Sequence, residues 1–214
     1  MHSAPGPIVV LGATGRTGLP LVRKLLDSGY RVRAQVRDPA KLTFAHERLE
    51  VATGDALDAE FADVLLAGAS AAISVVGQVD GSPPDVQTRI THNLLAAARR
   101  HGVTRIVSLT GAGVAHERDT PRVIDRLVRW VMRTFFGKLL RDAEAHARLL
   151  RDSDLAYTIV RAPRLTEDTA RGTYRTGYVG QVGTSLTRAD LAAFIVDELL
   201  TGGGHLRDEP AVSN

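Results

Sequence analysis

Short apolar runs alternate with longer segments of helical periodicity along most of the chain. Short runs that are continuously apolar or alternate with polar residues predict strands, and apolar positions spaced three or four apart predict helices. The predicted strands are 8–11, 31–37, 49–53, 71–76, 105–110 and 156–161. The predicted helices are 16–28, 58–66, 85–101 and 121–151. This alternation predicts a single α/β domain with a doubly wound parallel sheet of strand order 3-2-1-4-5-6.

Functional residues of such a sheet are expected in the loops that follow the strands. Ligands of open α/β sheets bind outside the carboxyl ends of the strands, where these loops gather. The loops are 12–18, 37–41, 54–55, 77–84, 110–113 and 162–169.

The loop after the first strand carries three glycines in a pattern typical of dinucleotide binding. The segment is IVVLGATGRTG at residues 8–18, with Gly12, Gly15 and Gly18. The first glycine allows a tight turn, the second lets the backbone approach a phosphate, and the third lets the helix pack close to the strand. The helix N-terminus and the hydroxyls of Thr14 and Thr17 would then bind the pyrophosphate. An ordinary strand-to-helix turn is the alternative, but the strand and helix on either side favour a Rossmann-type dinucleotide site.

The end of the second strand predicts which dinucleotide is bound. An NAD-binding chain usually carries an acidic residue here for the ribose, whereas this chain carries Arg37, whose guanidinium suits the 2′-phosphate of NADP. Lys41 lies one turn further on and Arg33 shares the strand face of Arg37, so both are candidates for the same phosphate. Two alternatives stay open: the arginines are a solvated strand face, or Asp38 accepts the ribose hydroxyls of NAD, the less favoured cofactor.

Three later loops add candidate cofactor contacts. Asp55 is placed to meet the adenine amino group, although a simple turn before the helix cap Asp58 explains it equally well. Val76 and Gly77 form an apolar shelf for the adenine ribose, since glycine lets the backbone come close. Thr110 lies where the nicotinamide ribose is expected.

Composition narrows the possible partners and the compartment. The 214 residues include no cysteine, which excludes disulfides, thiolate nucleophiles and cysteine metal sites, and no other metal site is predicted. The net charge of +3 comes from an arginine excess without a zinc-finger or aromatic-basic pattern, so no nucleic acid is expected as a partner. The first residues lack the apolar core of a signal peptide and no apolar run is long enough to span a bilayer. We therefore expect a cytoplasmic protein without stable membrane association.

A series of segments along the chain resembles one protein family. The segments are GATGRTG, VRDPAKL, GDALD, HGVTRIVSLTGAG, LLRDSDLAYTIVRAP and TRADLAAFI. Together they resemble the NAD(P)H-binding atypical short-chain dehydrogenase family, which includes flavin reductase-like biliverdin reductase B and NmrA-like proteins. The resemblance implies a pyrophosphate loop that includes Arg16, adenine contacts at Asp55 and Ala56, and a nicotinamide border at Pro163 and Arg164.

Ordinary short-chain dehydrogenases carry a tyrosine and a lysine four residues apart on a helix, and this chain has no such pair. The lysine lowers the pKa of the tyrosine, which then passes a proton to the substrate oxygen. None of Tyr30, Tyr157, Tyr174 and Tyr178 is followed by a lysine at that spacing, so no catalytic residue is assigned. Hydride transfer to a flavin, a quinone-like compound or another conjugated acceptor needs mainly stacking and proximity. We expect an NADPH-dependent reductase of such a small molecule; the alternative is a non-catalytic NADP(H)-binding redox sensor that acts through a protein partner.

Three further segments have more than one interpretation. Arg161 either holds an anionic acceptor together with Arg164 or pairs with a core carboxylate. His116 and Glu117 are either candidate acids or, as is favoured, residues that a polar loop exposes without a catalytic role. The helical segment 121–140 is basic and amphipathic; it is expected to pack its apolar face on the sheet, with a substrate wall, a protein interface or a weak membrane-surface contact as alternatives.

The expected domain organisation is simple. We predict an N-terminal tail over 1–7, one NAD(P)-binding domain over 8–202 with an irregular lid at about 165–187, and a C-terminal tail over 203–214 that is a short edge element or disordered.

Overall fold

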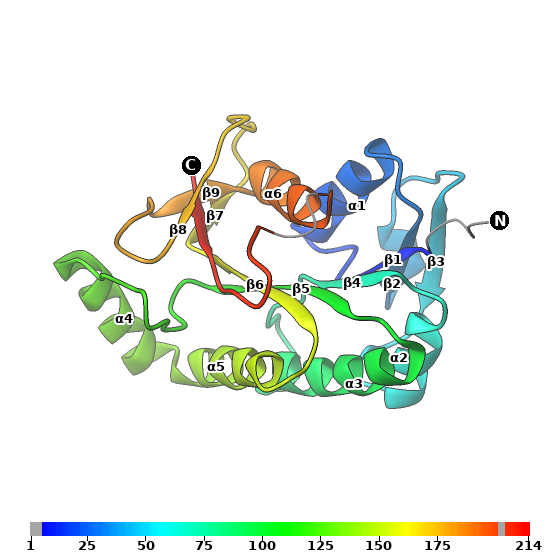
Figure 1. Cartoon of the computed structure of the whole chain (residues 1–214), viewed down its shortest axis with the longest axis horizontal. Helices are drawn as coiled ribbons and strands as arrows, with labels where there is room; N and C mark the ends of the chain where they lie inside the picture. Colours follow the sequence, from blue (N-terminus) through cyan, green and yellow to red (C-terminus); the bar gives the residue numbers. More distant parts are fainter. Residues whose placement is uncertain (1–5, 201–203) are drawn as a thin grey trace.

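The structure is a computed structural model that describes the chain except for residues 1–5 and 201–203. A central sheet lies between two layers of helices (Figure 1). Its strands are β1 (Ile8–Leu11), β2 (Val32–Val36), β3 (Leu49–Thr53), β4 (Ala71–Ser74), β5 (Arg105–Gly111), β6 (Ala156–Ala162), β8 (Arg175–Gly177) and β10 (Ala211–Ser213). A separate two-stranded sheet pairs β7 (Arg164–Thr166) with β9 (Ser185–Thr187).

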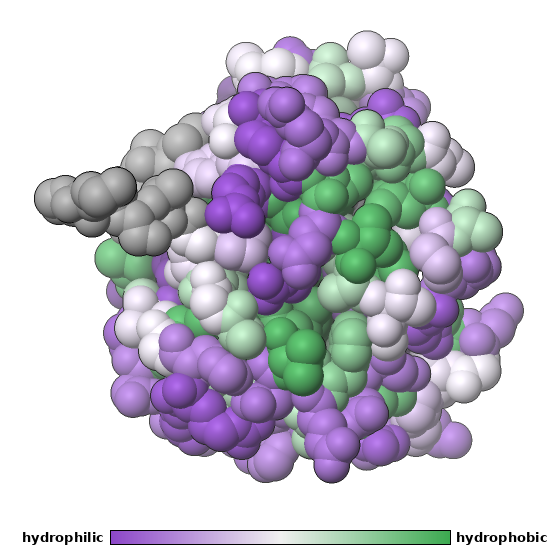
Figure 2. Space-filling view, turned by 90° about the vertical axis from the view of Figure 1, so that its right-hand side faces the viewer, coloured by the Kyte–Doolittle hydropathy of each residue, from purple (hydrophilic) through white to green (hydrophobic). Residues whose placement is uncertain are grey.

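The order of the large sheet is β3-β2-β1-β4-β5-β6-β10-β8. Its first six strands confirm the predicted doubly wound order, and all neighbours are parallel except β10 and β8. The chain changes direction across the sheet between β1 and β4, which is the switch point where open α/β sheets bind ligands. Figure 2 views the molecule from the end of the sheet that carries β3 and shows apolar side chains among hydrophilic ones. Val51 of β3 is among the exposed apolar residues.

The helices cover both faces of the sheet. They are α1 (Gly18–Asp27), the short 3-10 helix η1 (Pro39–Lys41), α2 (Ala59–Leu66), α3 (Val86–His101), α4 (Val123–Phe135), α5 (Gly137–Arg151) and α6 (Arg188–Leu200). One apolar core lies between the sheet and α2, α3 and α5, and a second lies between the sheet and α1 and α6. The strand β1 is buried along its whole length because helices cover it on both sides, which is why its sequence is continuously apolar.

The predicted helix 121–151 is wrong as a single element. The chain forms two helices, α4 and α5, which separate at Phe136 (φ −123°, ψ 29°) just before Gly137. Glycine weakens a helix, and α5 packs against α3 and the sheet while α4 leaves the body of the molecule. Figure 1 shows α4 at the outer end of the fold, beyond the last strands.

The expected packing of segment 121–140 also needs correction. None of the α4 residues is buried, so its apolar face does not pack on the sheet. The first helix is shorter than predicted, since α1 begins at Gly18 and the preceding residues form turns.

Two segments expected to be irregular contain strands. The lid region 165–187 includes part of β7 and all of β8 and β9. The C-terminal tail ends in β10, which is buried and inserted between β6 and β8 rather than lying at an edge. The position of this strand in the sheet could not be predicted from the sequence, because Ala211–Ser213 pairs with β6 and β8, which are distant in the chain. The predicted domain end at 202 and residues 1–5 of the N-terminal tail lie outside the described residues.

Candidate cofactor site and adjoining pocket

The glycine loop forms a tight turn at the carboxyl end of β1. Gly12 has φ +78°, a backbone conformation that residues other than glycine rarely adopt. A Cβ on Gly18 would lie 2.1 Å from the carbonyl oxygen of Gly12, so only glycine permits this close packing of helix on turn. No side chain caps the N-terminus of α1 at Thr17. The positive end of this helix is therefore open to an anion, as a pyrophosphate site requires.

Two threonines and one arginine of this loop lie in different surroundings. Thr14 is partly exposed, whereas Thr17 is buried and its hydroxyl accepts a hydrogen bond from Arg188 Nη1 at 2.6 Å. Arg16 is exposed and lies 3.7 Å from the carboxylate of Glu167. The same carboxylate accepts a hydrogen bond from Arg188 Nε at 2.7 Å. Glu167 thus links the start of the lid segment to the glycine loop.

Gln35 is a positioning residue that sequence reasoning missed. Its side chain is buried at the end of β2, where Oε1 accepts the Gly12 N–H at 3.2 Å and Nε2 donates to the Gly54 carbonyl at 2.7 Å. One amide therefore ties together the loops that follow β1 and β3. The available signal was a polar residue inside an otherwise apolar strand, VRAQV.

Arg37 and Lys41 lie on the same loop after β2, and both are exposed. Asp38 sits between them and caps η1, where its carboxylate accepts the Ala40 N–H at 3.1 Å. Arg33 points elsewhere: it pairs with Glu50 at 2.8 Å and donates to the carbonyl at the end of α2, on Leu65. Arg33 is therefore excluded from the group that can meet a phosphate beside Arg37.

The loops after β3 and β4 border the glycine turn. Asp55 is exposed and its carboxylate accepts the Leu57 N–H at 2.9 Å, which stabilises a turn. Ala56 is buried in the core, so its side chain does not reach the surface beside Asp55. Val76 is half-buried and Gly77 exposed, and the backbone of Val76 lies against Gly12.

Thr110 ends the row of polar side chains on one face of β5. Its side chain is 4% exposed, and its Oγ1 is one of two buried side-chain polar atoms without a hydrogen-bond partner among the residues that the structure describes. A buried hydroxyl without a partner is unfavourable, so this atom fits a site completed by a ligand. Thr110 does not line the pocket described below, which begins at the next residue.

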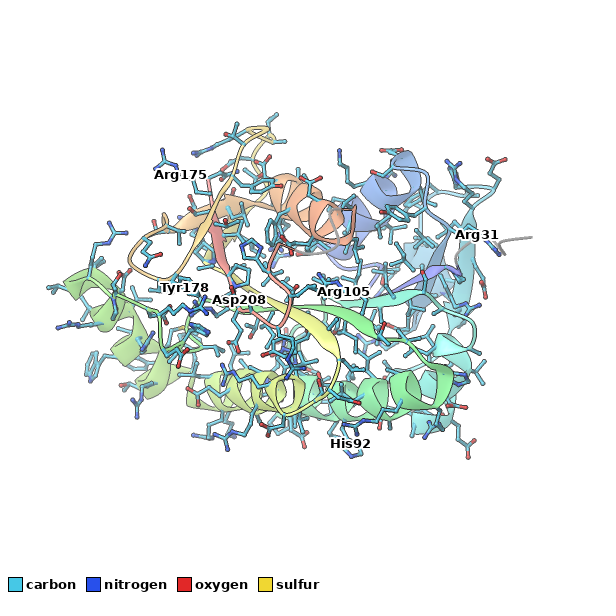
Figure 3. All side chains as sticks on the ribbon, viewed as in Figure 1. Arg31, His92, Arg105, Arg175, Tyr178 and Asp208 are labelled. Carbon is cyan, nitrogen blue, oxygen red and sulfur yellow. The ribbon has the colours of Figure 1, made fainter. Side chains whose placement is uncertain are left out.

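Behind Thr110, a buried histidine joins β5 to two helices. His146 of α5 lies 2.8 Å from Thr91 Oγ1 through Nδ1 and 3.4 Å from Ser108 Oγ through Nε2. Burial lowers the pKa of His146 to about 4, so the ring is neutral at pH 7. His146 is therefore a hydrogen-bonded core residue. His92, by contrast, points outward from α3 (Figure 3).

A pocket of about 470 Å³ opens beside the ends of β5 and β6. Its walls include residues 111–113, Pro163 and Arg164, residues 179–180 and 182–184, and one side of α4. The α4 residues in the wall are Ile124, Asp125, Val128, Arg129 and Met132. The size and mainly apolar lining are typical of a small-molecule site. The geometry therefore supports the interpretation of segment 121–140 as a pocket wall.

A buried ion pair lies next to residues that line this pocket. Arg161 is 0% exposed, and its guanidinium binds both carboxylate oxygens of Asp119 at 2.9 and 3.0 Å. Burial alone would raise the pKa of Asp119, but hydrogen bonds from Arg161 and from the backbone N–H groups of His116 and Val179 lower it below its ordinary value. Arg161 therefore pairs with a core carboxylate, and its alternative role as an acceptor-binding residue is excluded by its burial.

The two candidate acids, His116 and Glu117, lie outside this pocket. The His116 ring stacks on Tyr178 at 5.0 Å, and the Tyr178 hydroxyl donates to Asp208 at 2.8 Å. Figure 3 shows Tyr178 and Asp208 side by side. Burial and the hydrogen bond to Asp208 raise the pKa of Tyr178. Glu117 is exposed, and neither His116 nor Glu117 lines the pocket.

Comparison with known proteins identifies the family. A model of the NAD(P)H-binding family matches residues 12–201. The chain belongs to this family. Its resemblance to atypical short-chain dehydrogenases is thereby confirmed, and the matched region begins at Gly12, the first glycine of the loop. Within the described residues, no helix is both long and apolar enough to cross a membrane.

Two relatives show how far the likeness extends. Dihydroflavonol 4-reductase of Hordeum vulgare is 32% identical over 139 residues, which are 57% of this chain and 39% of that protein. Oxidoreductase stcQ of Emericella nidulans is 32% identical over 209 residues, which are 88% of this chain and 75% of that protein. The match thus spans well under half of the plant reductase but most of the fungal protein.

A solved structure has the same fold. A short-chain dehydrogenase/reductase of Veillonella parvula, in complex with NADP, superimposes with a TM-score of 0.81 at 20% identity, covering 98% of this chain and 94% of that chain. At this identity the likeness shows the shared fold, and the bound NADP is a property of that protein.

Proposed function

We propose that this protein is an NADPH-dependent reductase that transfers a hydride to a flat conjugated acceptor, such as a flavin or a quinone-like compound. The observation that carries the proposal is the mainly apolar pocket of about 470 Å³ beside Pro163 and Arg164, at the sheet edge that also carries the glycine loop. A dinucleotide that starts at the glycine loop and crosses the switch point would bring its nicotinamide toward this pocket.

The proposed cofactor contacts follow the carboxyl ends of the strands. They are Gly12, Thr14, Gly15, Arg16, Thr17 and Gly18 for the pyrophosphate, Arg37 and Lys41 for the 2′-phosphate, Asp55 and the backbone at Ala56 for adenine, and Val76, Gly77, Thr110, Pro163 and Arg164 for the riboses and nicotinamide. The unpartnered Oγ1 of Thr110 would gain a hydrogen bond in this arrangement.

NADP is the proposed cofactor in preference to NAD. Arg37 and Lys41 are both exposed and bring two positive charges to one loop, where a phosphate gains charge-assisted hydrogen bonds. The carboxylate of Asp38, which is the alternative partner for the ribose hydroxyls of NAD, already accepts the Ala40 N–H.

The chemistry proposed here needs no tyrosine acid. Bound NADPH supplies a hydride, which adds two electrons to the acceptor, and the acceptor takes its proton from solvent. The side chains of Ile124, Val128 and Met132 would hold the acceptor flat and exclude water from one of its faces. Arg164 would bind a negative group on the acceptor, because it is exposed at the pocket border.

The first test is NADPH oxidation by the purified protein with FMN as acceptor, compared between wild type, Arg37→Ala and Arg31→Ala. Losing the Arg37 guanidinium is expected to weaken NADPH binding by roughly 10- to 100-fold and NADH binding much less. Arg31 is exposed at the opposite end of β2 and serves as the matched control. Equal losses for NADPH and NADH in Arg37→Ala would refute the NADP preference.

A non-catalytic redox sensor is the second candidate. The absence of a tyrosine–lysine pair and the exposed apolar residues of α4, which offer a surface to a protein partner, favour it. NADPH binding without turnover on FMN and on quinone acceptors would support the sensor. We propose a reducing compartment such as the cytoplasm for either function, because the chain has no cysteine.

A further inference from the structure

Helix α4 exposes apolar side chains that the rest of the chain leaves uncovered. Val123 is 82% exposed and Trp130 61% exposed, and none of the α4 residues is buried. The exposed apolar residues of α4 and its C-cap are Val123, Ile124, Leu127, Val128, Trp130, Phe135 and Phe136. Isolated surface hydrophobic residues are ordinary, whereas a contiguous set on one helix marks an interaction site.

The arrangement around the helix is strongly amphipathic. At 3.6 residues per turn, the apolar side chains cover roughly half of the circumference. Arg126, Arg129 and Arg133 lie together on the other side, next to Asp125. Apolar residues therefore occupy the pocket wall and also the side of α4 that faces away from the body.

Positive charge borders this apolar surface. Arg129 and Arg122 lie within ion-pair distance of Asp119 and Asp125 respectively. Arg126 and Arg133 are exposed and, within the part of the chain that the structure describes, have no carboxylate at ion-pair distance. The start of α5 extends the same charge with Lys138 and Arg141, both exposed.

We infer that α4 docks reversibly on an anionic lipid surface. Aromatic and aliphatic residues beside arginines are what a helix needs to lie at the boundary between headgroups and acyl chains. Each arginine near such a surface adds attraction to anionic headgroups. A second copy of this chain is the alternative occupant of the apolar side chains, and the oligomeric state measured below tests it. This inference goes beyond the proposed reductase activity and does not require it.

Docking through α4 would place the pocket mouth at the membrane. Ile124 and Val128 are exposed on the helix surface and also line the pocket. If the proposed function also holds, an apolar acceptor dissolved in lipid could enter along these two side chains without crossing water.

Trp130 gives a direct measurement, because it is the single tryptophan of the chain. We would titrate the full protein, without NADPH or acceptor, with vesicles of phosphatidylcholine and with vesicles containing about one third phosphatidylglycerol. The expected result is a blue shift of Trp130 emission and co-sedimentation with the anionic vesicles, both weakened by salt. The double variant Arg126→Gln/Arg133→Gln is expected to bind about 30-fold more weakly. Leu127→Glu is expected to abolish the blue shift.

Matched control variants distinguish docking through α4 from non-specific binding of the protein to vesicles. Arg31 lies at the other end of the molecule (Figure 3), and Val64 is 71% exposed on α2, so Arg31→Gln and Val64→Glu are expected to bind vesicles like wild type. Circular dichroism establishes that each variant is folded.

Three outcomes would overturn the inference. The first is that the wild-type protein does not bind anionic vesicles. The second is that the control substitutions weaken vesicle binding as much as the α4 substitutions do. The third is that sedimentation velocity shows a dimer that Leu127→Glu dissociates, while the wild-type protein does not bind vesicles. Failure of NADPH turnover leaves the vesicle result unchanged, so the two proposals fail separately.

Discussion

Arg129 on α4 and Arg161 on β6 share one carboxylate, that of Asp119. Oδ2 of Asp119 lies 3.0 Å from Arg161 Nη1 and 3.4 Å from Arg129 Nη2. The other oxygen accepts the backbone N–H of Val179, which is part of the pocket wall, at 3.0 Å. A single buried side chain therefore connects β6 with the loop at 179 and with the outlying helix α4.

Asp119→Asn is expected to destabilise the protein strongly. The substitution leaves Arg161 buried without its counter-ion, and removing one partner of a buried pair typically costs about 3–5 kcal/mol. Urea unfolding at pH 7 measures the loss. Glu50→Gln, which removes the partner of Arg33 at a half-exposed pair, is the control and is expected to cost much less. Comparable losses of stability for both variants would show that the buried Asp119 pair contributes no more to stability than the half-exposed pair.

The central sheet could be predicted from the sequence because its signals are local. The strand around Val10 is apolar throughout and those around Ile73 and Val160 are mainly apolar, as is typical of a parallel sheet with helices on both faces. Gly12 and Gly18 identified the first loop because a turn and a close approach demand glycine at those positions. The family comparison then confirmed the cofactor class.

The remaining features depend on contacts between distant residues. Arg161 pairs with Asp119 across 42 positions, and Gln35 joins loops that no sequence pattern connects. The wrong prediction for α4 has a different cause. Amphipathic periodicity shows that a helix has an apolar side, but it does not specify whether the sheet, a pocket or an external surface covers that side.

His146 is expected to make stability depend on pH below neutrality. Its folded pKa of about 4 lies below the unfolded value of 6.5, so the unfolded state binds the proton first as the pH falls. Stability is therefore complete above about pH 6.5 and decreases between pH 6.5 and pH 4, with roughly 2 kcal/mol lost by pH 5.

The measurement is urea unfolding at pH 7 and pH 5 for wild type and His146→Gln. The variant is expected to lose about 2 kcal/mol less than wild type between the two pH values, whatever its stability at pH 7. His92→Gln alters an exposed histidine and should keep the wild-type pH dependence. An unchanged pH dependence in His146→Gln would contradict this account.

Gly18→Ala is expected to distort the glycine loop. The added Cβ would meet the Gly12 carbonyl at 2.1 Å, and because that atom is backbone the turn and α1 must move apart. Overpacking of this kind costs about 1–3 kcal/mol, measurable by urea unfolding. If the loop binds the dinucleotide, NADPH affinity measured by cofactor fluorescence should fall at least about tenfold. The control is Gly137→Ala, whose Cβ would meet only the flexible Arg141 side chain at 3.4 Å; equal effects of both would exclude a steric role for Gly18.

Glu167→Gln is expected to tighten NADPH binding at low salt. Glu167 lies 3.7 Å from Arg16 and 2.7 Å from Arg188, so its charge competes with a phosphate for two basic groups beside the glycine loop. The carboxylate is 61% exposed, and solvent limits the expected gain to about two- to fivefold in Kd. Added salt should reduce this gain, since exposed charges are screened. Glu144→Gln, which makes the same charge change on the exposed side of α5, should leave the Kd unchanged. If Glu167→Gln weakens binding instead, its carboxylate orients the arginines for the cofactor rather than competing with it.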